Sequence, residues 1–131
     1  MGLIYLDSCL LIYLVEQDPE RGARVAEAIA AHAEADFAIS PLVRLECLVR
    51  PLRDADVVLL RRYESMFATT AALPMDDRVF DDAAHLRARF GLRTPDALHL
   101  SCAKRHGCTA LWTNDARLAR AGTGLALNVL D

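Results

Sequence analysis

The sequence predicts an α/β fold with three layers, in which a mostly parallel central sheet of about four to five strands has helices on both faces. Short, continuously apolar runs typical of strands alternate along the chain with longer amphipathic runs typical of helices. Strands buried on both faces have this unbroken apolar character. The chain of 131 residues suits one domain with one core, and no repeat, linker or low-complexity segment divides it.

The first half of the chain begins with the apolar run Leu3–Leu6, which predicts a buried strand that ends on Asp7. Ser8 can cap the following helix, because serine side chains accept hydrogen bonds from the free N–H groups of a first turn. Apolar periodicity and the Asp, Ser and Pro signals predict the other elements of this half. They are a helix at about 9–16, a helix from Asp18 to about Ala33, a strand at 37–39, a helix from Ser40-Pro41 and a helix at about 54–68.

The helix that begins at Ser40-Pro41 has apolar residues at positions i, i+3, i+7 and i+10. This spacing places them on one face of the helix, so we expect that face to pack against the core. The residues of this stripe are Leu42, Leu45, Val49 and Leu52. Glu46 lies on the flank of the stripe, between its apolar face and solvent.

The second half of the chain is organised around a helix and a strand between Thr94 and Asp115. Thr94 is a suitable N-cap, Pro95 fits the first helical position, and His106-Gly107 ends the helix. The same kinds of signal predict the other elements of this half. They are a weak strand at 71–74, a helix from Asp76-Asp77 to Phe90 that Gly91 ends, a strand at 109–112, a short helix from Ala116 and a last strand at 125–130.

Composition and charge exclude several classes of protein. Apolar residues make up 53% of the chain and charged residues 25%, which is typical of a globular protein. The net charge of -3 argues against nucleic-acid binding driven by the charge of the whole surface. The four cysteines form no C-x-x-C pair, so we expect reduced thiols in a cytoplasmic protein, without a zinc site or disulfides. No signal peptide or membrane-spanning run is predicted.

Acidic residues occupy positions at which a parallel sheet holds its ligands. Asp7 and Asp115 follow strands, and the carboxyl ends of parallel strands meet at one edge of the sheet. Asp96 lies in the first turn of its helix. Taken singly, the aspartates could be helix caps or favourable first-turn charges, and Glu46 could form a solvent-exposed pair with Arg50. Taken together, we expect the four acids to line one pocket, where their mutual repulsion requires a cation.

The expected pocket offers carboxylate oxygens, the ligands that suit Mg²⁺ or Mn²⁺. Such an ion can polarise a phosphoryl oxygen and activate water for hydrolysis. The sequence has no Ser-His-Asp or Cys-His constellation, no P-loop and no G-x-G-x-x-G that would compete with this chemistry. His99 faces the same side of its helix as Asp96, and is either a packed helix residue or a base. Ser8 and Asn114 can donate hydrogen bonds around the acids or serve as caps.

Four runs of the sequence resemble the acidic motifs of PIN-domain ribonucleases. They are IYLDSCLLIYLVE, ISPLVRLECLVRP, TPDALHLSCA and LWTND, and the match is closest to the VapC-type toxins of toxin–antitoxin pairs. The resemblance covers essentially the whole chain, which we interpret as one PIN-like domain over 1–131. One position departs from the family pattern, because Leu118 stands where the family often has an aromatic residue after the last acid. Leucine can fill the same apolar role.

The resemblance implies a PIN-like fold and a Mg²⁺- or Mn²⁺-dependent endoribonuclease with an RNA substrate. The acids that the family uses for catalysis and metal binding fall at Asp7, Glu46, Asp96 and Asp115. Thr113 and Asn114 match the residues before the last acid. The resemblance also implies a homodimer and a small antitoxin protein that blocks the site.

Arginines near the acidic segments are candidates to hold RNA, because a guanidinium group suits bidentate contact with phosphate. We expect RNA contacts from some members of a set that comprises Arg44, Arg50, Arg87, Arg89, Arg93 and Arg117. Such contacts make RNA affinity fall with added salt.

Other functions explain part of the pattern. A non-catalytic PIN-like module could bind RNA or a protein and keep its acids for structure. A receiver domain needs two adjacent acids after the first strand and a lysine that ends a late strand. Here Ser8-Cys9 follows Asp7, and the only lysine, Lys104, lies in a predicted helix. A haloacid-dehalogenase-type phosphatase needs D-x-D at the first strand, and Cys9 stands in place of its second acid.

Overall fold

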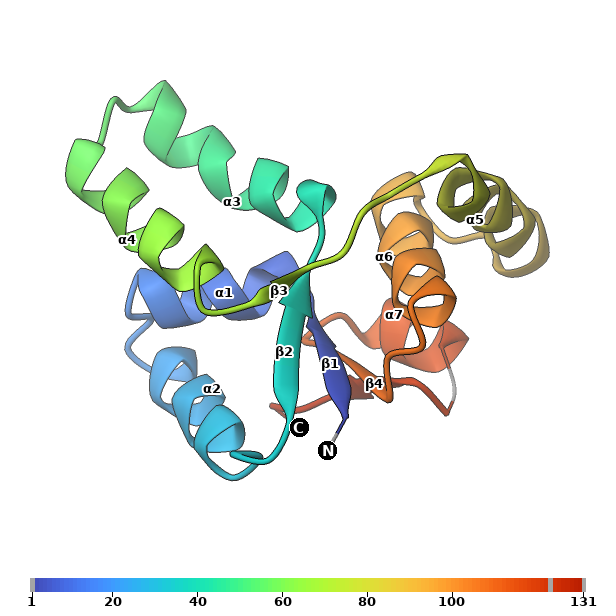
Figure 1. Cartoon of the computed structure of the whole chain (residues 1–131), viewed down its shortest axis with the longest axis horizontal. Coiled ribbons are helices and arrows are strands. Elements are labelled where there is room, and N and C mark those ends of the chain that lie inside the picture. The colour runs from blue at the N-terminus through green and yellow to red at the C-terminus, as the bar shows by residue number, and fades with distance from the viewer. Residues whose placement is uncertain (1, 123, 131) are drawn as a thin grey trace.

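The computed structural model describes residues 2–122 and 124–130, and its centre is a five-stranded parallel sheet in the order β3-β2-β1-β4-β5 (Figure 1). The elements in chain order are β1 Leu3–Leu6, α1 Ser8–Val15, α2 Arg21–Ala30, β2 Asp36–Ile39, α3 Pro41–Arg53, α4 Val57–Phe67, β3 Ala71–Ala72, α5 Asp77–Phe90, α6 Thr94–Arg105, β4 Ala110–Thr113, α7 Ala116–Ala121 and β5 Ala126–Asn128. The predicted α/β class and the parallel sheet are confirmed.

Helices cover the two faces of the sheet in the order in which the chain supplies them. Figure 1 shows α1 to α4 on one side of the strands and α5 to α7 on the other. The chain therefore builds the sheet in one direction from β1 through β2 to β3, and in the other direction through β4 to β5. The strand order reverses between β1 and β4, and ligands of open α/β sheets bind at such a reversal, beyond the carboxyl ends of the strands.

The register of β1 and β4 brings their carboxyl ends together. Leu6 lies opposite Trp112, and the backbone N–H of Asp7 donates to the carbonyl oxygen of Trp112 at 3.0 Å. Both strands are apolar and buried at their centre, with Tyr5 and Leu111 fully enclosed. The side chains that follow the two strands thus emerge side by side.

Helix α6 is enclosed along most of its length, since every residue from Asp96 to Ala103 is buried. It packs against α5 and β4. Polar groups on such a helix need partners within the protein. Ser101, for example, donates from its hydroxyl to the carbonyl oxygen of Val79 at 2.6 Å.

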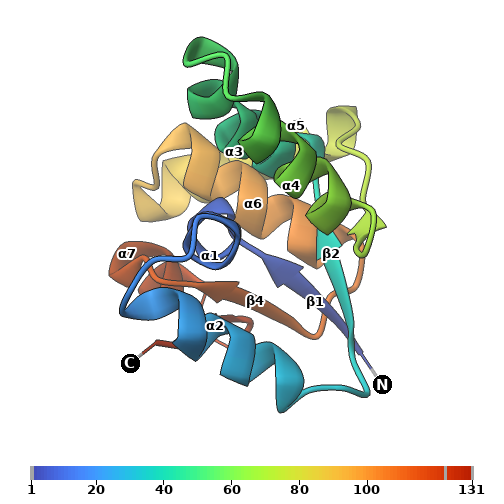
Figure 2. The same cartoon turned by 90° about the vertical axis from the view of Figure 1, so that its left-hand side faces the viewer.

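The predicted core stripe of α3 is wrong for three of its four residues, because only Leu42 packs against the core. Leu45, Val49 and Leu52 are 59%, 50% and 61% exposed. The face of α3 that packs inward instead carries Val43, Cys47 and Pro51. The buried and the exposed sets lie on different sides of the helix. The spacing of the apolar residues in the sequence shows that they share one face, but it does not show whether that face contacts the core or solvent. Figure 2 shows α3 and α4 as a helical hairpin above α1, with part of its surface turned away from the sheet.

Several boundaries and caps also differ from the prediction. Asp7, and not Ser8, is the N-cap of α1, because its side chain accepts from the backbone N–H of Ser8 at 2.8 Å. Arg93 occupies the N-cap position of α6, so that Thr94 is its first helical residue. Helix α2 is shorter than the predicted 18–33, and β5 is shorter than the predicted 125–130. None of the helices in the described residues has the length and hydropathy that crossing a bilayer requires.

Candidate active site

The four acids singled out in the sequence line one cavity of about 470 Å³ at the reversal between β1 and β4. Each comes from a different segment, because Asp7 follows β1, Asp115 lies just beyond β4, Asp96 is in the first turn of α6 and Glu46 is in the middle of α3. The residues around the cavity are Asp7, Ser8, Cys9, Tyr13, Glu46, Asp96, Asn114, Asp115 and Ala116.

Asp7 is fixed by hydrogen bonds to both of its oxygens. Oδ1 accepts from the backbone N–H of Ser8 at 2.8 Å, and Oδ2 accepts from the hydroxyl of Thr113 at 2.7 Å. The Thr113 hydroxyl oxygen also accepts from the backbone N–H of Asp115 at 2.9 Å. The buried Thr113 therefore connects the two acids that follow the strands, a role the sequence allowed but did not specify.

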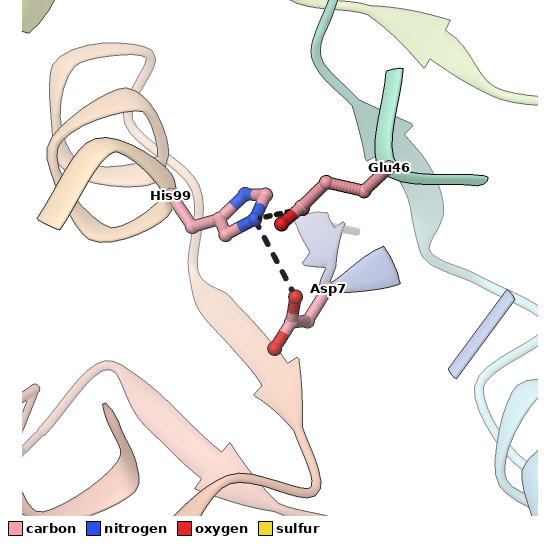
Figure 3. Close-up of side chains that lie close together, drawn as sticks. All are labelled: Asp7, Glu46 and His99. Atoms are coloured by element: carbon pink, nitrogen blue, oxygen red, sulfur yellow. Dashed lines mark hydrogen bonds and ion pairs between the residues drawn. The ribbon is translucent and has the colours of Figure 1, made fainter. Parts of the chain in front are cut away.

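Glu46 reaches the cavity from α3 and is held through one oxygen. Oε1 accepts from the Ser8 hydroxyl at 3.1 Å and lies 2.7 Å from His99 Nε2 (Figure 3). Burial alone raises the pKa of Glu46, but the hydrogen bonds from His99 and Ser8 outweigh it and lower the pKa. The alternative pairing with Arg50 does not form, since Arg50 Nη1 lies 2.9 Å from Glu16 Oε1.

Asp96 is buried, with 8% of the residue exposed, and its Oδ2 has no hydrogen-bond partner among the described residues. Arg93 Nε lies 3.5 Å from this oxygen, within ion-pair range but without hydrogen-bond geometry. Burial raises the pKa of Asp96, the charges of Asp115 and Asp7 raise it further, and Arg93 offsets part of the effect. A buried carboxylate oxygen in this state is costly unless a cation or water satisfies it.

Asp115 divides its two oxygens between the fold and the cavity. Oδ1 caps α7 by accepting from the backbone N–H groups of Arg117 and Leu118, at 2.8 and 3.3 Å. Oδ2 lies 3.3 Å from Arg93 Nη2. Arg93, whose side chain is 65% exposed, thus bridges Asp96 and Asp115 from the solvent side.

His99 and Tyr5 form a buried part of the site, of which the sequence indicated only His99. His99 is 1% exposed, its Nδ1 lies 2.7 Å from the Tyr5 hydroxyl oxygen, and its Nε2 lies 3.6 Å from Asp7 Oδ1 as well as close to Glu46. Figure 3 shows the imidazole ring directed at both carboxylates. Ligand atoms of Asp7, Glu46 and His99 all lie within 4.8 Å of one another. The spacing of His99 from Asp96 indicated the shared helix face, but nothing in the sequence indicated Tyr5.

A family model for the PIN domain matches residues 4–124. The chain belongs to the PIN-domain family. Ribonuclease VapC46 of Mycobacterium tuberculosis (strain ATCC 25618 / H37Rv) is 33% identical over 132 residues, which cover 99% of this chain and 98% of that protein. The chain is therefore homologous to a VapC ribonuclease along its whole length.

Solved structures share the fold of this PIN domain. A toxin–antitoxin complex from Klebsiella pneumoniae contains a chain with a TM-score of 0.80 and 20% identity, covering 96% of this chain and 97% of that one. VapBC2 from Rickettsia felis, bound to a DNA fragment from their promoter, gives 0.77 and 15%, covering 95% and 97%. VapC20 of Mycobacterium tuberculosis, described as a Sarcin-Ricin loop cleaving toxin, gives 0.74 and 14%, covering 91% and 95%.

Cys9 also lines the cavity of this PIN domain, but its thiol does not suit the role of a nucleophile. Burial raises the pKa of Cys9 to about 12, and the nearby charge of Asp7 adds to this effect. The thiol therefore stays protonated near neutral pH, and a protonated thiol is a poor nucleophile.

Asn114 donates from its side-chain amide to the Tyr13 hydroxyl at 3.2 Å, which holds both side chains at the rim of the cavity.

The arginines singled out in the sequence fall into two groups. Arg93 and Arg117 line a second cavity of about 450 Å³ that shares Asp96 with the acidic cavity, and Phe90 and Arg120 line it with them. The others contact protein groups away from the acids. Arg44 pairs with Glu64 and lies over the Phe67 ring, Arg50 pairs with Glu16, Arg87 donates to the Leu92 carbonyl oxygen, and Arg89 lies over the Phe90 ring.

The residues of the acidic cavity fit a divalent cation. They supply carboxylate oxygens, which hard cations prefer, and one of these oxygens, Oδ2 of Asp96, is buried without a hydrogen bond. The only cation within ion-pair range of that oxygen in the described chain is the largely exposed Arg93. Exposed pairs of this kind contribute only about 0–1 kcal/mol, so the acids remain poorly compensated by the protein alone.

Proposed function

We propose that this PIN domain is a metal-dependent endoribonuclease, the toxin of a type II toxin–antitoxin pair, and that it cleaves RNA phosphodiester bonds. Homology to a VapC ribonuclease over the full chain supports the reaction class. The observation that carries the proposal is the convergence of four carboxylates on one cavity with a buried Asp96 oxygen left without a partner. Asp7, Glu46, Asp96 and Asp115 would hold Mg²⁺ or Mn²⁺ there.

When bound, such an ion supplies a polarised phosphoryl oxygen and a water of lowered pKa. The protein supplies the arrangement of the groups around it. Thr113 keeps the acids of β1 and β4 at a fixed separation, and Ser8 donates to both Asp7 and Glu46 through its backbone and its hydroxyl. Hydrogen bonds behind the acids of a metal site commonly determine its affinity.

A purely structural role for the acids accounts for only part of the geometry. Asp7 and Asp115 do cap α1 and α7, as the simpler reading of the sequence expects. Glu46 caps no helix, and Asp96 has an oxygen that no protein group satisfies in the described residues. In a non-catalytic module the unsatisfied Asp96 oxygen would only lower stability, whereas in a cation site it would serve as a ligand.

The test is RNA cleavage by the purified protein, free of any partner, with Mg²⁺ or Mn²⁺ and with EDTA. We expect structured RNA to be cut with either metal and to remain intact in EDTA. Asp81→Asn serves as a control for lost negative charge, because Asp81 is exposed on α5 and does not line the cavity. Cleavage that continues at full rate in EDTA contradicts the metal-dependent mechanism.

We propose that bound RNA extends from the acidic cavity into the neighbouring cavity, which arginines line. Arg93 belongs to both regions, because it contacts Asp96 and Asp115 and also lines the second cavity with Arg117. An exposed aromatic ring, that of Phe90, stands at the same cavity and offers a surface for base stacking. Arg44 and Arg50 stay as weaker candidates, since neither lines either of these two cavities.

The salt dependence of RNA affinity tests this path. We expect Arg93→Ala and Arg117→Ala each to reduce the slope of log affinity against log salt by about one. Arg44→Ala and Arg50→Ala should change it less. Arg78→Ala is the control, because Arg78 is exposed in the first turn of α5, about 18 Å along that helix from Phe90 at 1.5 Å per residue. Equal slopes for all these variants and the wild type place the RNA elsewhere.

A small antitoxin is proposed to cover the exposed apolar face of α3 and the start of α4. This face consists of Leu45, Val49, Leu52, Val57 and Val58, each at least half exposed. Contiguous exposed apolar side chains commonly mark interaction sites. Leu45→Glu with Leu52→Glu should abolish copurification with the antitoxin while RNA cleavage persists. Retained binding excludes this face.

We propose a homodimer, which the family resemblance implies, and a cytoplasmic location, which the cysteine pattern favours. Light scattering of the purified chain tests the first of these. We expect the mass of two chains, and a mass of one chain at all concentrations used for cleavage contradicts a dimer. Fractionation of the producing cells tests the second, with the chain expected in the soluble fraction.

A further inference from the structure

We infer that His99 is a positioning residue that fixes the carboxylate of Glu46, that Tyr5 and Ser40 hold His99 in place, and that His99 is not itself a metal ligand. The inference rests on the proposed function, because Glu46 belongs to the proposed cation site. Its basis is a continuous buried chain of contacts. Ser40 Oγ lies 2.7 Å from the Tyr5 hydroxyl oxygen, which lies 2.7 Å from His99 Nδ1, and Nε2 lies 2.7 Å from Glu46 Oε1.

The Nε2 atom of His99 must carry a hydrogen. A carboxylate accepts hydrogen bonds but donates none when ionised, and a glutamate side chain is ordinarily ionised at neutral pH. A contact of 2.7 Å between Nε2 and Oε1 is then possible only if Nε2 donates. A nitrogen that carries a hydrogen has no free lone pair for a metal ion, and Nδ1 already faces Tyr5.

The direction of the remaining bonds follows from Ser40. Its hydroxyl oxygen accepts from the backbone N–H of Val43 at 3.3 Å, and its only other partner in the described chain is Tyr5. If Ser40 donates to Tyr5 and Tyr5 donates to Nδ1, every hydrogen of the chain has an acceptor. In the reverse direction the hydrogen of the buried Ser40 hydroxyl has none within 2–122 and 124–130, an arrangement that folded proteins avoid.

This chain of bonds leaves one oxygen of Glu46 available. Both hydrogen bonds to Glu46, from Ser8 and His99, go to Oε1, and none reaches Oε2 in the part of the chain that the structure describes. His99 belongs to α6 and Glu46 to α3, which lie on opposite sides of the sheet in Figure 1. The contact therefore links the two helical layers across the cavity, and it directs Oε2 of Glu46 rather than Oε1 to a cation. Such bonds behind a ligand fix its orientation.

Long-range ¹H–¹⁵N NMR of the full chain reads the state of both imidazole nitrogens directly. The His99 signals are assigned by their loss in His99→Gln. We expect a protonated Nε2 and an unprotonated Nδ1, unchanged when Mg²⁺ is added. An unprotonated Nε2, or loss of its hydrogen on addition of Mg²⁺, makes His99 a ligand and overturns the inference.

Calorimetric titration with Mn²⁺ measures the positioning effect apart from RNA cleavage. We expect the dissociation constant to rise about 10-fold in His99→Ala and to recover substantially in His99→Gln, which keeps a donor near the Nε2 position. Tyr5→Phe should weaken Mn²⁺ binding by a smaller factor, and it serves in place of His99→Ala if that variant does not fold.

The outcomes separate this inference from the proposed function. If the wild type binds Mn²⁺ with the expected pattern across the variants but cuts no RNA, the ribonuclease proposal fails and the positioning role stands. If His99→Ala and Tyr5→Phe melt at lower temperature yet bind Mn²⁺ as the wild type does, the contact only packs the core and the inference is wrong. It is also wrong if the wild type binds no Mn²⁺.

Discussion

The two walls of the acidic cavity differ in how the fold treats their carboxylates. On the wall formed by Asp7 and Glu46, protein donors that include Thr113 and His99 reach both oxygens of Asp7 and Oε1 of Glu46. On the wall formed by Asp96 and Asp115, the partner within reach of both is an exposed arginine, and one oxygen of Asp96 has no hydrogen bond in the described chain. The protein therefore satisfies most of the first wall, whereas on the second it leaves a buried carboxylate oxygen unsatisfied.

The difference in hydrogen bonding between the two walls affects stability because Asp7 and Asp96 are both buried. Asp96 is as buried as Asp7, so each loses solvation by water, but only Asp7 regains hydrogen bonds from the protein. A buried polar group without a partner costs about 1–3 kcal/mol, and more if it is charged. We therefore expect a cation to act mainly on Asp96, and the predictions below compare the two walls.

The largest effect should be on catalysis, where the two walls behave alike. Asp7→Asn and Asp96→Asn each remove a charged oxygen from the proposed cation site, and charge stabilisation by a metal is worth several kcal/mol of the barrier, which corresponds to orders of magnitude in rate. Single-turnover cleavage of a structured RNA with Mn²⁺ measures the loss. Asp81→Asn should cleave at the wild-type rate. Near-normal cleavage by either cavity variant removes that acid from the site.

The next effect is stabilisation by the metal. A ligand at about 100 times its dissociation constant stabilises the folded protein by about 2.7 kcal/mol. We expect Mn²⁺ to raise the melting temperature of the wild type and of Asp81→Asn, and to raise that of Asp96→Asn far less. Thermal unfolding with Mn²⁺ and with EDTA checks this. A shift of Asp96→Asn equal to that of the wild type would place the cation away from Asp96.

Without metal, the two walls should respond in opposite directions. Asp96→Asn removes an uncompensated buried charge, and we expect the protein in EDTA to gain about 0.5–2 kcal/mol, the usual gain when functional strain is removed. Asp7→Asn replaces an oxygen that accepts from the Thr113 hydroxyl with an amide nitrogen, and it should lose about 1 kcal/mol. Urea denaturation in EDTA measures both. The same sign for the two variants contradicts the distinction between the walls.

The smallest effect is a pH dependence of the Asp96→Asn gain. The folded pKa of Asp96 is raised, so the folded state binds this proton more tightly than the unfolded state does. The resulting cost to stability grows as pH rises from about 3.9, the ordinary value for aspartate, through the raised folded pKa, and it is complete above that. The gain of Asp96→Asn over wild type in EDTA should therefore be present at pH 7 and shrink toward pH 4. A gain that is constant over this range excludes relief of charge as its cause.

Much of this site could be predicted because its acids lie next to local sequence signals for the start of a helix or the end of a strand. Asp7 and Asp115 follow apolar strand runs, and Asp96 follows a Thr-Pro helix start, so a parallel sheet brings them to one edge. Thr113 followed from its place in the LWTND run. The unequal treatment of Asp7 and Asp96 did not follow, because it depends on donors that only folding supplies.

The rest could not be predicted because it depends on contacts between distant segments. Tyr5 and His99 are 94 positions apart, and the sequence presents Tyr5 as one member of an apolar strand. On α3, the exposed apolar stripe and the buried face with Val43 and Cys47 both have helical spacing. Periodicity identifies an apolar face, but the packing of α3 on its neighbours decides whether that face meets the core or solvent.

Calorimetric titration of Mn²⁺ into the metal-free protein tests most directly whether the wall formed by Asp96 and Asp115 is part of a cation site. We expect saturable binding to the wild type and to Asp81→Asn, and binding to Asp96→Asn that is at least 10-fold weaker, the order of effect seen when even groups behind a ligand are removed. Binding of equal affinity to Asp96→Asn and the wild type, or no binding to the wild type, would contradict the account.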